Sequence, residues 1–269
     1  MKRVCSCSSA ALTKSALGLL AAMAVTGVPA FAAWAQEAEA RSILKAMTDY
    51  VSQQQSLSLK YDADVEVVTP AVEKIQFSAS GDVNMSRPNK FRISRTGGYA
   101  DVELISDGSN VTVYDRGGNR FAQVPAAGSF DEVVAMLRTE APVELPGADL
   151  LSSKSYDELM AGVLEAKHIG RGVVEGVECE HLAFRNLDTD WQIWVEVGEK
   201  PVPRKYVITS KAVGAAPQYT LRLRDWKTGV SPAADAFAFK PPEGSSGVAF
   251  TLLKDIDEIP AGVVPGGAK

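Results

Sequence analysis

Residues 91–124, FRISRTGGYADVELISDGSNVTVYDRGGNRFAQV, decide the fold class of this chain. Four short segments within it, 91–96, 101–106, 111–114 and 120–124, carry the β-branched and aromatic residues typical of strands. The turns that separate them include DGSN at 107–110 and RGGN at 116–119, which are rich in residues that tolerate positive φ. Connections this short join antiparallel neighbours, so we predict consecutive β-hairpins.

The same period-two alternation continues on both sides of this stretch. It predicts strands around 65–67, 75–77, 167–174, 178–185, 191–197, 202–210 and 218–226. An apolar stripe at helical spacing predicts a helix over 36–55, and capping boxes at Ser129-x-x-Glu132 and Ser155-x-x-Glu158 predict two short helices. We therefore expect one mainly β (α+β) domain over residues 36–258, with a single antiparallel sheet of about eleven strands and about three helices, followed by a flexible tail at 259–269.

The first 35 residues predict a cleaved secretory signal. Lys2, Arg3 and Lys14 precede a short apolar run at 15–28, and two small-x-small endings follow it. We expect cleavage after Ala35, with Ala32 as the second choice and an uncleaved anchor as the alternative. The protein is therefore expected in the periplasm, without a transmembrane segment in the mature chain.

Charge and cysteine content exclude several classes of partner. Removing three basic residues from the 28 in the chain leaves 25 against 33 acidic ones, so the mature protein is acidic and a nucleic-acid partner is not expected. Cys5 and Cys7 leave with the signal, and neither follows the apolar run, as a lipidated cysteine would. Cys179 alone remains, which excludes an internal disulfide.

No sequence motif predicts catalysis. The chain has two histidines and none of the spacings of a zinc, phosphate-loop or nucleophile-elbow motif. Cys179 and His181, two apart on a predicted strand, would share a face and are weak candidates for a soft metal or a hydrolytic site. The acidic pairs Asp188/Asp190 and Asp255/Asp257 are interpreted as solvated turn residues. We predict no enzyme activity, no catalytic residue, no metal and no cofactor.

Two parts of the sequence resemble known families. Arg87-Pro-Asn-Lys-Phe-Arg92, followed by Ser106-Asp-Gly and Tyr114, resembles a pattern of the periplasmic outer-membrane lipoprotein carrier superfamily. The C-terminal half, with Cys179-Glu-His181, Asp190-Trp-Gln-Ile-Trp194 and Ala216-Pro-Gln-Tyr219, resembles an uncharacterised family known as predicted periplasmic proteins.

The resemblance implies that the sheet curves into a half-barrel whose concave face the helices close. In the carriers the hollow holds acyl chains, and the arginine matched by Arg87 helps to govern lid closure. We therefore expect a lipid, an acyl chain or a lipid-modified protein as cargo, with a ligand-binding set of Arg87, Phe77, Phe91, Ile193 and Leu221. Alternatively, the helices fill the hollow completely. A second hypothesis is a protein-interaction or envelope-stress-sensing module that binds an envelope protein through exposed aromatics such as Trp194.

Overall fold

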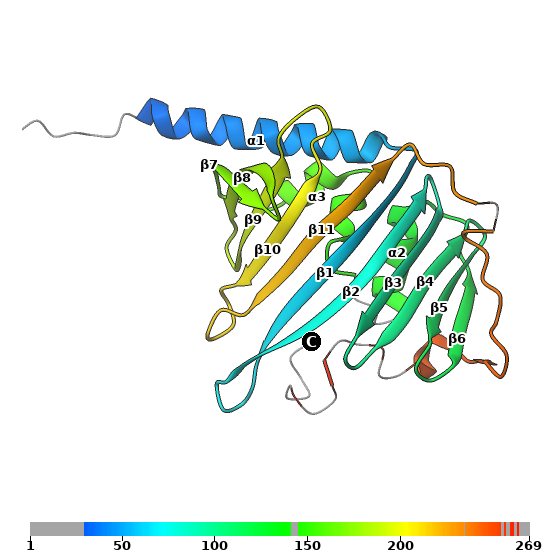
Figure 1. Ribbon diagram of the computed structural model, residues 1–269. Coiled ribbons are helices and arrows are strands. Elements are labelled where there is room, and N and C mark those ends of the chain that lie inside the picture. The colour runs from blue at the N-terminus through cyan, green and yellow to red at the C-terminus, as the bar shows by residue number, and fades with distance from the viewer. Residues whose placement is uncertain are drawn as a thin grey trace, which may run out of the picture.

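The computed structural model describes residues 30–140, 145–233, 235–253, 256, 259–260 and 263. Its strands form one open, strongly curved sheet (Figure 1). The strands are β1 (Ser56–Val68), β2 (Lys74–Ser86), β3 (Lys90–Gly97), β4 (Asp101–Asp107), β5 (Asn110–Asp115), β6 (Arg120–Pro125), β7 (Glu165–Val174), β8 (Val177–Arg185), β9 (Thr189–Glu196), β10 (Pro203–Ser210), β11 (Gln218–Thr228) and β12 (Ser246–Gly247).

The predicted fold class is confirmed. The strand order is β12-β6-β5-β4-β3-β2-β1-β11-β10-β9-β8-β7, and β1 to β11 pair antiparallel throughout. A twelfth strand of two residues, β12, pairs parallel with β6, which the sequence pattern did not predict. The β7–β8 connection is a tight hairpin: Glu175 and Gly176 both have positive φ, 49° and 84°, as a two-residue type I′ turn requires.

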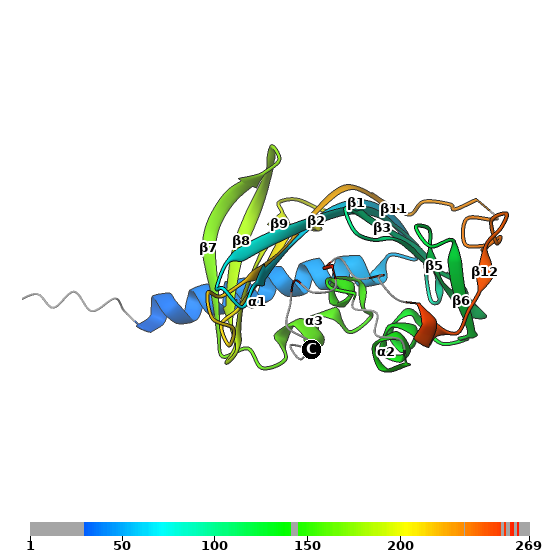
Figure 2. The same ribbon diagram turned by 90° about the horizontal axis from the view of Figure 1, so that it is seen from below.

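The helices lie on the concave side of the sheet (Figure 2). They are α1 (Ala30–Gln53), α2 (Phe130–Glu140), α3 (Ser155–Met160) and the two 3₁₀ turns η1 (Ala148–Leu151) and η2 (Phe250–Leu252). α1 begins before the predicted Gln36, and both predicted cleavage positions lie within its first turns. Residues 1–29 lie outside the described part, so signal cleavage stays a prediction.

One predicted cap is confirmed and the other is wrong. Before α2, the Ser129 amide donates to Glu132 Oε2 at 2.7 Å and the Glu132 amide to Ser129 Oγ at 3.4 Å, which is the capping box. Before α3, Ser155 is the first helical residue and its side chain caps nothing. Ser152 accepts the Lys154 amide instead and donates to Glu158, because the N-cap position is Lys154, one residue earlier than the pattern suggested.

The core fills the concave side. α1, α2, η1 and α3 press apolar side chains against the inward residues of the strands, and Leu253 and Ile256 of the last segment join them. Each such residue contributes about 1.5–3 kcal/mol on burial. The helix residues of the core are Ala40, Leu44, Met47, Val51, Phe130, Val133, Val134, Leu137, Ala148, Leu150, Leu151 and Leu159.

A close approach on this side needs a glycine. Tyr61 on β1 lies opposite Gly81 on β2, and its hydroxyl reaches across to donate to the Ser94 carbonyl on β3 at 2.8 Å. A Cβ at Gly81 would lie 2.0 Å from the Ser94 oxygen and 2.6 Å from the tyrosine ring. The ring therefore occupies the space that any other residue at 81 would need.

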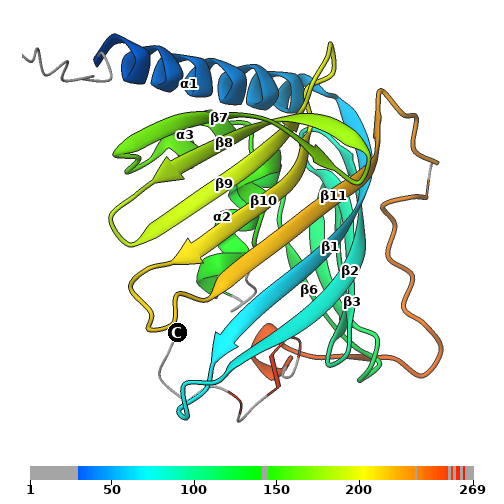
Figure 3. The same ribbon diagram turned by 60° about the vertical axis from the view of Figure 1, so that its left-hand side comes forward.

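The segment after β11 wraps around the β6 edge. Phe239 packs on the outer face against Tyr114 and Phe121, with ring centroids 5.6 and 5.1 Å apart. The chain then pairs with β6 as β12 and continues into η2 beside α2 (Figure 1). This path covers one edge of the sheet, and α1 packs against the other edge strand, β7 (Figure 3).

Candidate functional site

Three of the four apolar residues predicted to line a ligand cavity lie in the packed core. Phe91 and Ile193 are 0% exposed and Leu221 is 5% exposed. Phe91 packs edge-on against Phe130 of α2, with ring centroids 5.3 Å apart. The protein's own side chains cover these three residues, so the packing agrees with the alternative of a filled hollow at this part of the sheet. Their role as ligand contacts stays a prediction.

Phe77 lies apart from the other three. It is on the same face of β2 but near the end of the β1–β2 hairpin, outside the main core cluster. Its ring packs edge-on against Tyr99, with centroids 5.4 Å apart, and it is 7% exposed. The predicted set is therefore not one contiguous wall.

Arg87 ties three segments together. Its Nη2 donates to the Leu151 carbonyl in η1 at 2.7 Å, and its Nε donates to the Gln54 carbonyl after α1 at 3.1 Å. Burial lowers the pKa of Arg87, and the nearby charge of Asp131 opposes that shift. The half-buried guanidinium thus joins the covering segment at 148–151 to the chain just after α1, and the closing role that the resemblance implied stays a prediction. Its predicted contact with a ligand stays a prediction.

An apolar cavity of about 240 Å³ lies where α2 meets β6 and the last segment. It is lined by Gln123, Val124, Met136, Leu137, Val248, Ala249, Phe250 and Thr251, of which none is titratable. Sequence reasoning predicted the α2 helix with Leu137 but missed this cavity. The missing information was the parallel pairing of β12 with β6, which brings residues 248–251 to α2 and leaves no period-two signal in so short a strand.

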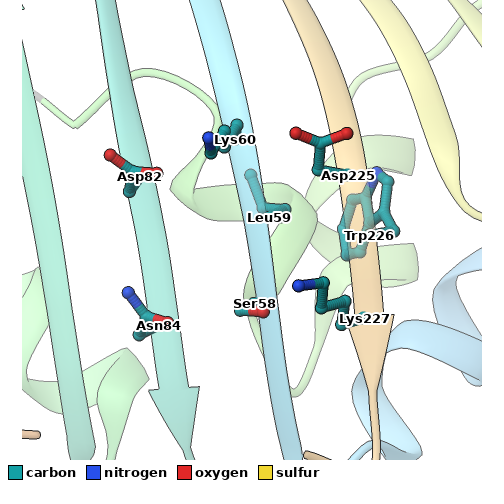
Figure 4. Close-up of a pocket in the computed structure, with 8 residues that line it drawn as sticks. All are labelled: Ser58, Leu59, Lys60, Asp82, Asn84, Asp225, Trp226 and Lys227. Atoms are coloured by element: carbon teal, nitrogen blue, oxygen red, sulfur yellow. The ribbon is translucent and has the colours of Figure 1, made fainter.

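A larger groove of about 530 Å³ lies on the outer face and is polar (Figure 4). Asp225, at φ 55°, lies in a β-bulge that shifts the register between β1 and β11 beside the groove. Lys60 of β1 lies between Asp82 of β2 and Asp225 of β11, with Asn84 and Lys227 farther along the strands (Figure 4). The groove contains none of the predicted ligand-binding residues.

Cys179 and His181 share the outer face but show no sign of reactivity. Cys179 is fully buried, and burial raises the pKa of its thiol to about 11, so it is a neutral thiol near pH 7. Burial lowers the pKa of His181, whose Nε2 lies 2.9 Å from Gln192 Oε1. Within the described ranges, no three His, Cys, Asp or Glu side chains are grouped so that they could hold a metal ion.

The acidic pairs take different positions. Asp190 accepts a 2.7 Å ion pair from Lys211, and Asp188 lies exposed in the β8–β9 turn. Asp188 agrees with its interpretation as a surface turn residue, whereas Asp190 is the second residue of β9, so the interpretation is wrong for Asp190. Asp255 and Asp257 lie outside the described residues.

Trp194 lies on the outer face, as predicted from its strand position. His181 stacks on it with ring centroids 4.1 Å apart and 12° between the planes, and Lys205 Nζ lies 4.7 Å from the ring centroid. His181, Trp194 and Lys205 therefore form a row across β8, β9 and β10, which we call the outer-face row. Trp194 is half-buried, so its neighbours hold its orientation while part of the indole faces solvent.

Comparison with solved structures returns proteins of low identity. LprF from Mycobacterium bovis is 12% identical, with 74% of this chain and 98% of that chain covered and a TM-score of 0.46. A LolA superfamily protein from Nitrosomonas europaea is 13% identical, with 74% and 97% covered and a TM-score of 0.33. MucB in complex with MucA is 14% identical, with 75% and 60% covered and a TM-score of 0.39.

No curated protein matches the sequence. Among the described residues, no helix is long and apolar enough to cross a membrane. A family model described as "Predicted periplasmic protein (DUF2092)" matches residues 40–251. This match confirms the resemblance of the C-terminal half and extends it over most of the chain. The protein belongs to the DUF2092 family of predicted periplasmic proteins.

Proposed function

We propose that this protein is a non-enzymatic periplasmic binding protein that holds the acyl chain of a lipid or of a lipid-modified protein. The observation that carries the proposal is the 240 Å³ apolar cavity beneath α2 and η2. Its lining is mostly methyl, thioether and aromatic groups, with the Gln123 amide and the Thr251 hydroxyl as its polar groups and no acid or base, which supports binding rather than catalysis.

The size of the cavity limits what enters without movement. Sites for small molecules commonly measure about 300–1,000 Å³, so this one takes the end of a chain and not a whole lipid. Each methylene group that is buried contributes about 0.8 kcal/mol to the free energy of binding, so deeper insertion of the chain is favoured. A longer chain therefore requires α2 or η2 to move away from the sheet.

Few polar contacts hold the covering layer that must move. Asp131 at the start of α2 accepts from the amide of Ser153, at 3.2 Å, and from its hydroxyl. The Phe130 amide donates to the Pro88 carbonyl at 2.8 Å, and Arg87 holds η1. Displacement of α2 would break the contacts of Asp131 and Phe130, and would open space above Phe91 as Phe130 moves away with the helix.

The test is the binding of a fluorescent fatty acid to protein purified without detergent, together with its native mass. We expect saturable, one-to-one binding. Val124→Phe fills the cavity and should weaken binding at least tenfold. Val197→Phe, at a half-exposed valine in the β9–β10 turn, is the matched control and should bind as the wild type does. A wild type that takes up neither fatty acid nor phospholipid refutes the proposal.

The second candidate function is a protein-interaction module without a small ligand. It is favoured by the outer-face row of His181, Trp194 and Lys205, because an oriented, partly exposed tryptophan beside a cation is a typical anchor of protein interfaces. Capture of one specific envelope protein by the wild type and its loss with Trp194→Ala would support this candidate. Fatty-acid binding that is unchanged in Trp194→Ala would assign the two properties to separate sites.

A further inference from the structure

The antiparallel topology divides the turns between two ends of the half-barrel. One end carries the start of β7 and the β8–β9, β10–β11, β1–β2, β3–β4 and β5–β6 turns (Figure 3). The opposite end carries the β7–β8, β9–β10, β2–β3 and β4–β5 turns. The two ends can therefore be compared directly for the side chains that they present.

Exposed apolar side chains gather at the first end. Ten large hydrophobic residues are exposed among the described residues, and six of them lie on five neighbouring connections there or, for Ile75, at the strand end beside one. We call these six the apolar rim: Leu164 (64% exposed), Leu187 (78%), Val213 (47%), Val72 (70%), Ile75 (38%) and Tyr99 (59%).

The opposite end is polar by comparison. Its turns consist of sequences such as Asp107-Gly-Ser-Asn110 and Glu175-Gly176 and contain none of the exposed large hydrophobic residues. Val173, beside the β7–β8 turn, is the one exposed apolar residue near that end in the described chain. The asymmetry is a property of the turns, since both ends belong to the same strands.

Val72 is held in a conformation that its side chain disfavours. Its φ is 63°, in the left-handed region, where a β-branched residue is strained and glycine is favoured. The Val72 amide donates to the Thr69 carbonyl at 2.8 Å and the Thr69 amide to the Glu73 carbonyl at 2.9 Å, so the turn imposes this backbone. The fold thus keeps a strained valine at the end of its longest hairpin with the side chain in solvent.

We propose that the apolar rim docks this protein onto the surface of a phospholipid bilayer. Neighbouring connections at this end are two strands apart, about 10 Å, so the rim offers separate protrusions rather than one continuous patch. A fluid interface accepts each protrusion independently, whereas a protein partner would need a matching hollow for each one.

Two lysines beside the rim are paired within the protein, whereas the acidic Glu73 and Asp188 lie exposed next to Val72 and Leu187. Lys74 forms a 2.8 Å ion pair with Glu66, and Lys211 pairs with Asp190. The chain as a whole carries a net charge of −5. Apolar insertion therefore drives the docking, and a zwitterionic surface suits it better than an anionic one.

The test is flotation of the whole protein with phosphatidylcholine vesicles in a density gradient. We expect the wild type to float with the vesicles, with little change at about 0.5 M salt, where surface charges are screened beyond about 5 Å. Val72→Asp/Val213→Asp should lower the bound fraction at least tenfold. Val173→Asp is the matched control, because Val173 is 71% exposed but lies near the other end, and it should bind as the wild type does.

A second variant separates docking from folding. Val72→Gly relieves the strain at φ 63°, so it should raise the melting temperature while it lowers vesicle binding several-fold. A wild type that does not float, or an equal loss with Val173→Asp, overturns the proposal. A wild-type dimer that the double variant abolishes, without vesicle binding, would assign the rim to a protein interface instead. Fatty-acid binding does not depend on the rim, so it reports separately on the proposed function.

Discussion

Replacing Phe91 with alanine removes the ring on which α2 rests. Phe91 is 0% exposed on β3, and its ring meets that of Phe130, the first residue of α2, at a centroid distance of 5.3 Å and an interplanar angle of 86°. The substitution therefore leaves a cavity between the sheet and the helix. It tests whether the concave face is a packed core at this point or the wall of a ligand site.

The magnitude follows from this burial. Truncation of a fully buried phenylalanine to alanine costs about 3–5 kcal/mol, because the transfer free energy is lost and a cavity remains. The edge-to-face pair adds about 0.5–1.5 kcal/mol of coupling, which the cycle of Phe91→Ala, Phe130→Ala and the double variant isolates. Urea unfolding gives these values from the midpoints, provided that the slope m stays constant.

A loss of less than about 1 kcal/mol for Phe91→Ala would refute the interpretation of this region as filled core. A coupling free energy near zero would show that α2 rests on β3 only loosely. In that case α2 would be free to lift, and the present volume of the cavity beneath it would give little indication of how much ligand the site takes.

Three further predictions concern polar groups. Arg87→Ala leaves the Leu151 and Gln54 carbonyls without their donor, so it should lower the free energy of unfolding in urea by about 1.5–3 kcal/mol. A lysine cannot reproduce both hydrogen bonds of the planar guanidinium, so recovery of most of this free energy by Arg87→Lys would contradict the prediction. Burial opposes a charged His168, but hydrogen bonds from both ring nitrogens to Glu39 (3.0 Å) and Glu180 (2.8 Å) outweigh it and raise the pKa of His168 above its ordinary 6.5. The stability advantage of the wild type over His168→Gln should thus be full below about pH 6.5 and should disappear as the pH rises through the raised pKa; melting curves that differ by the same amount at every pH would argue against this. Cys179, with a thiol pKa of about 11, should resist iodoacetamide at pH 7 in the native protein and react once it is unfolded, and rapid native alkylation would contradict the buried neutral thiol.

Much of the fold could be predicted because its signals are local. From β3 to β11, alternation of apolar and polar residues predicted the strands within a few residues of their observed bounds, and the turns at 107–110 and 116–119 predicted hairpins that make the sheet antiparallel. For β1 and β2 the prediction covered only the part around 65–67 and 75–77 of two strands of 13 residues. The Ser129–Glu132 box predicted the start of α2, because both of its hydrogen bonds join residues three apart. The box at Ser155 failed because Ser155 is already the first residue of the helix, one position past the N-cap, where its side chain caps nothing.

The candidate site could be predicted only in part. The sequence identified Phe91, Ile193 and Leu221 as inward-facing, because strand alternation determines the face. It could not show whether a helix, the last segment or a ligand covers that face, since the cover comes from segments far along the chain, as Phe130 of α2 on Phe91 of β3 illustrates. The cavity beside Leu137 was missed for the same reason.

The sequence by itself determined the strand periodicity, the hairpin connections, the acidic charge and the absence of known catalytic motifs, because each depends on residue identity or near neighbours. The tertiary structure alone decided three other things: that the concave face is largely filled, that Arg87 binds main-chain carbonyls of η1 and the end of α1, and that six exposed apolar residues share one rim. These depend on contacts between segments far apart in the chain, and packing against a curved sheet, rather than local propensity, determines which segments meet.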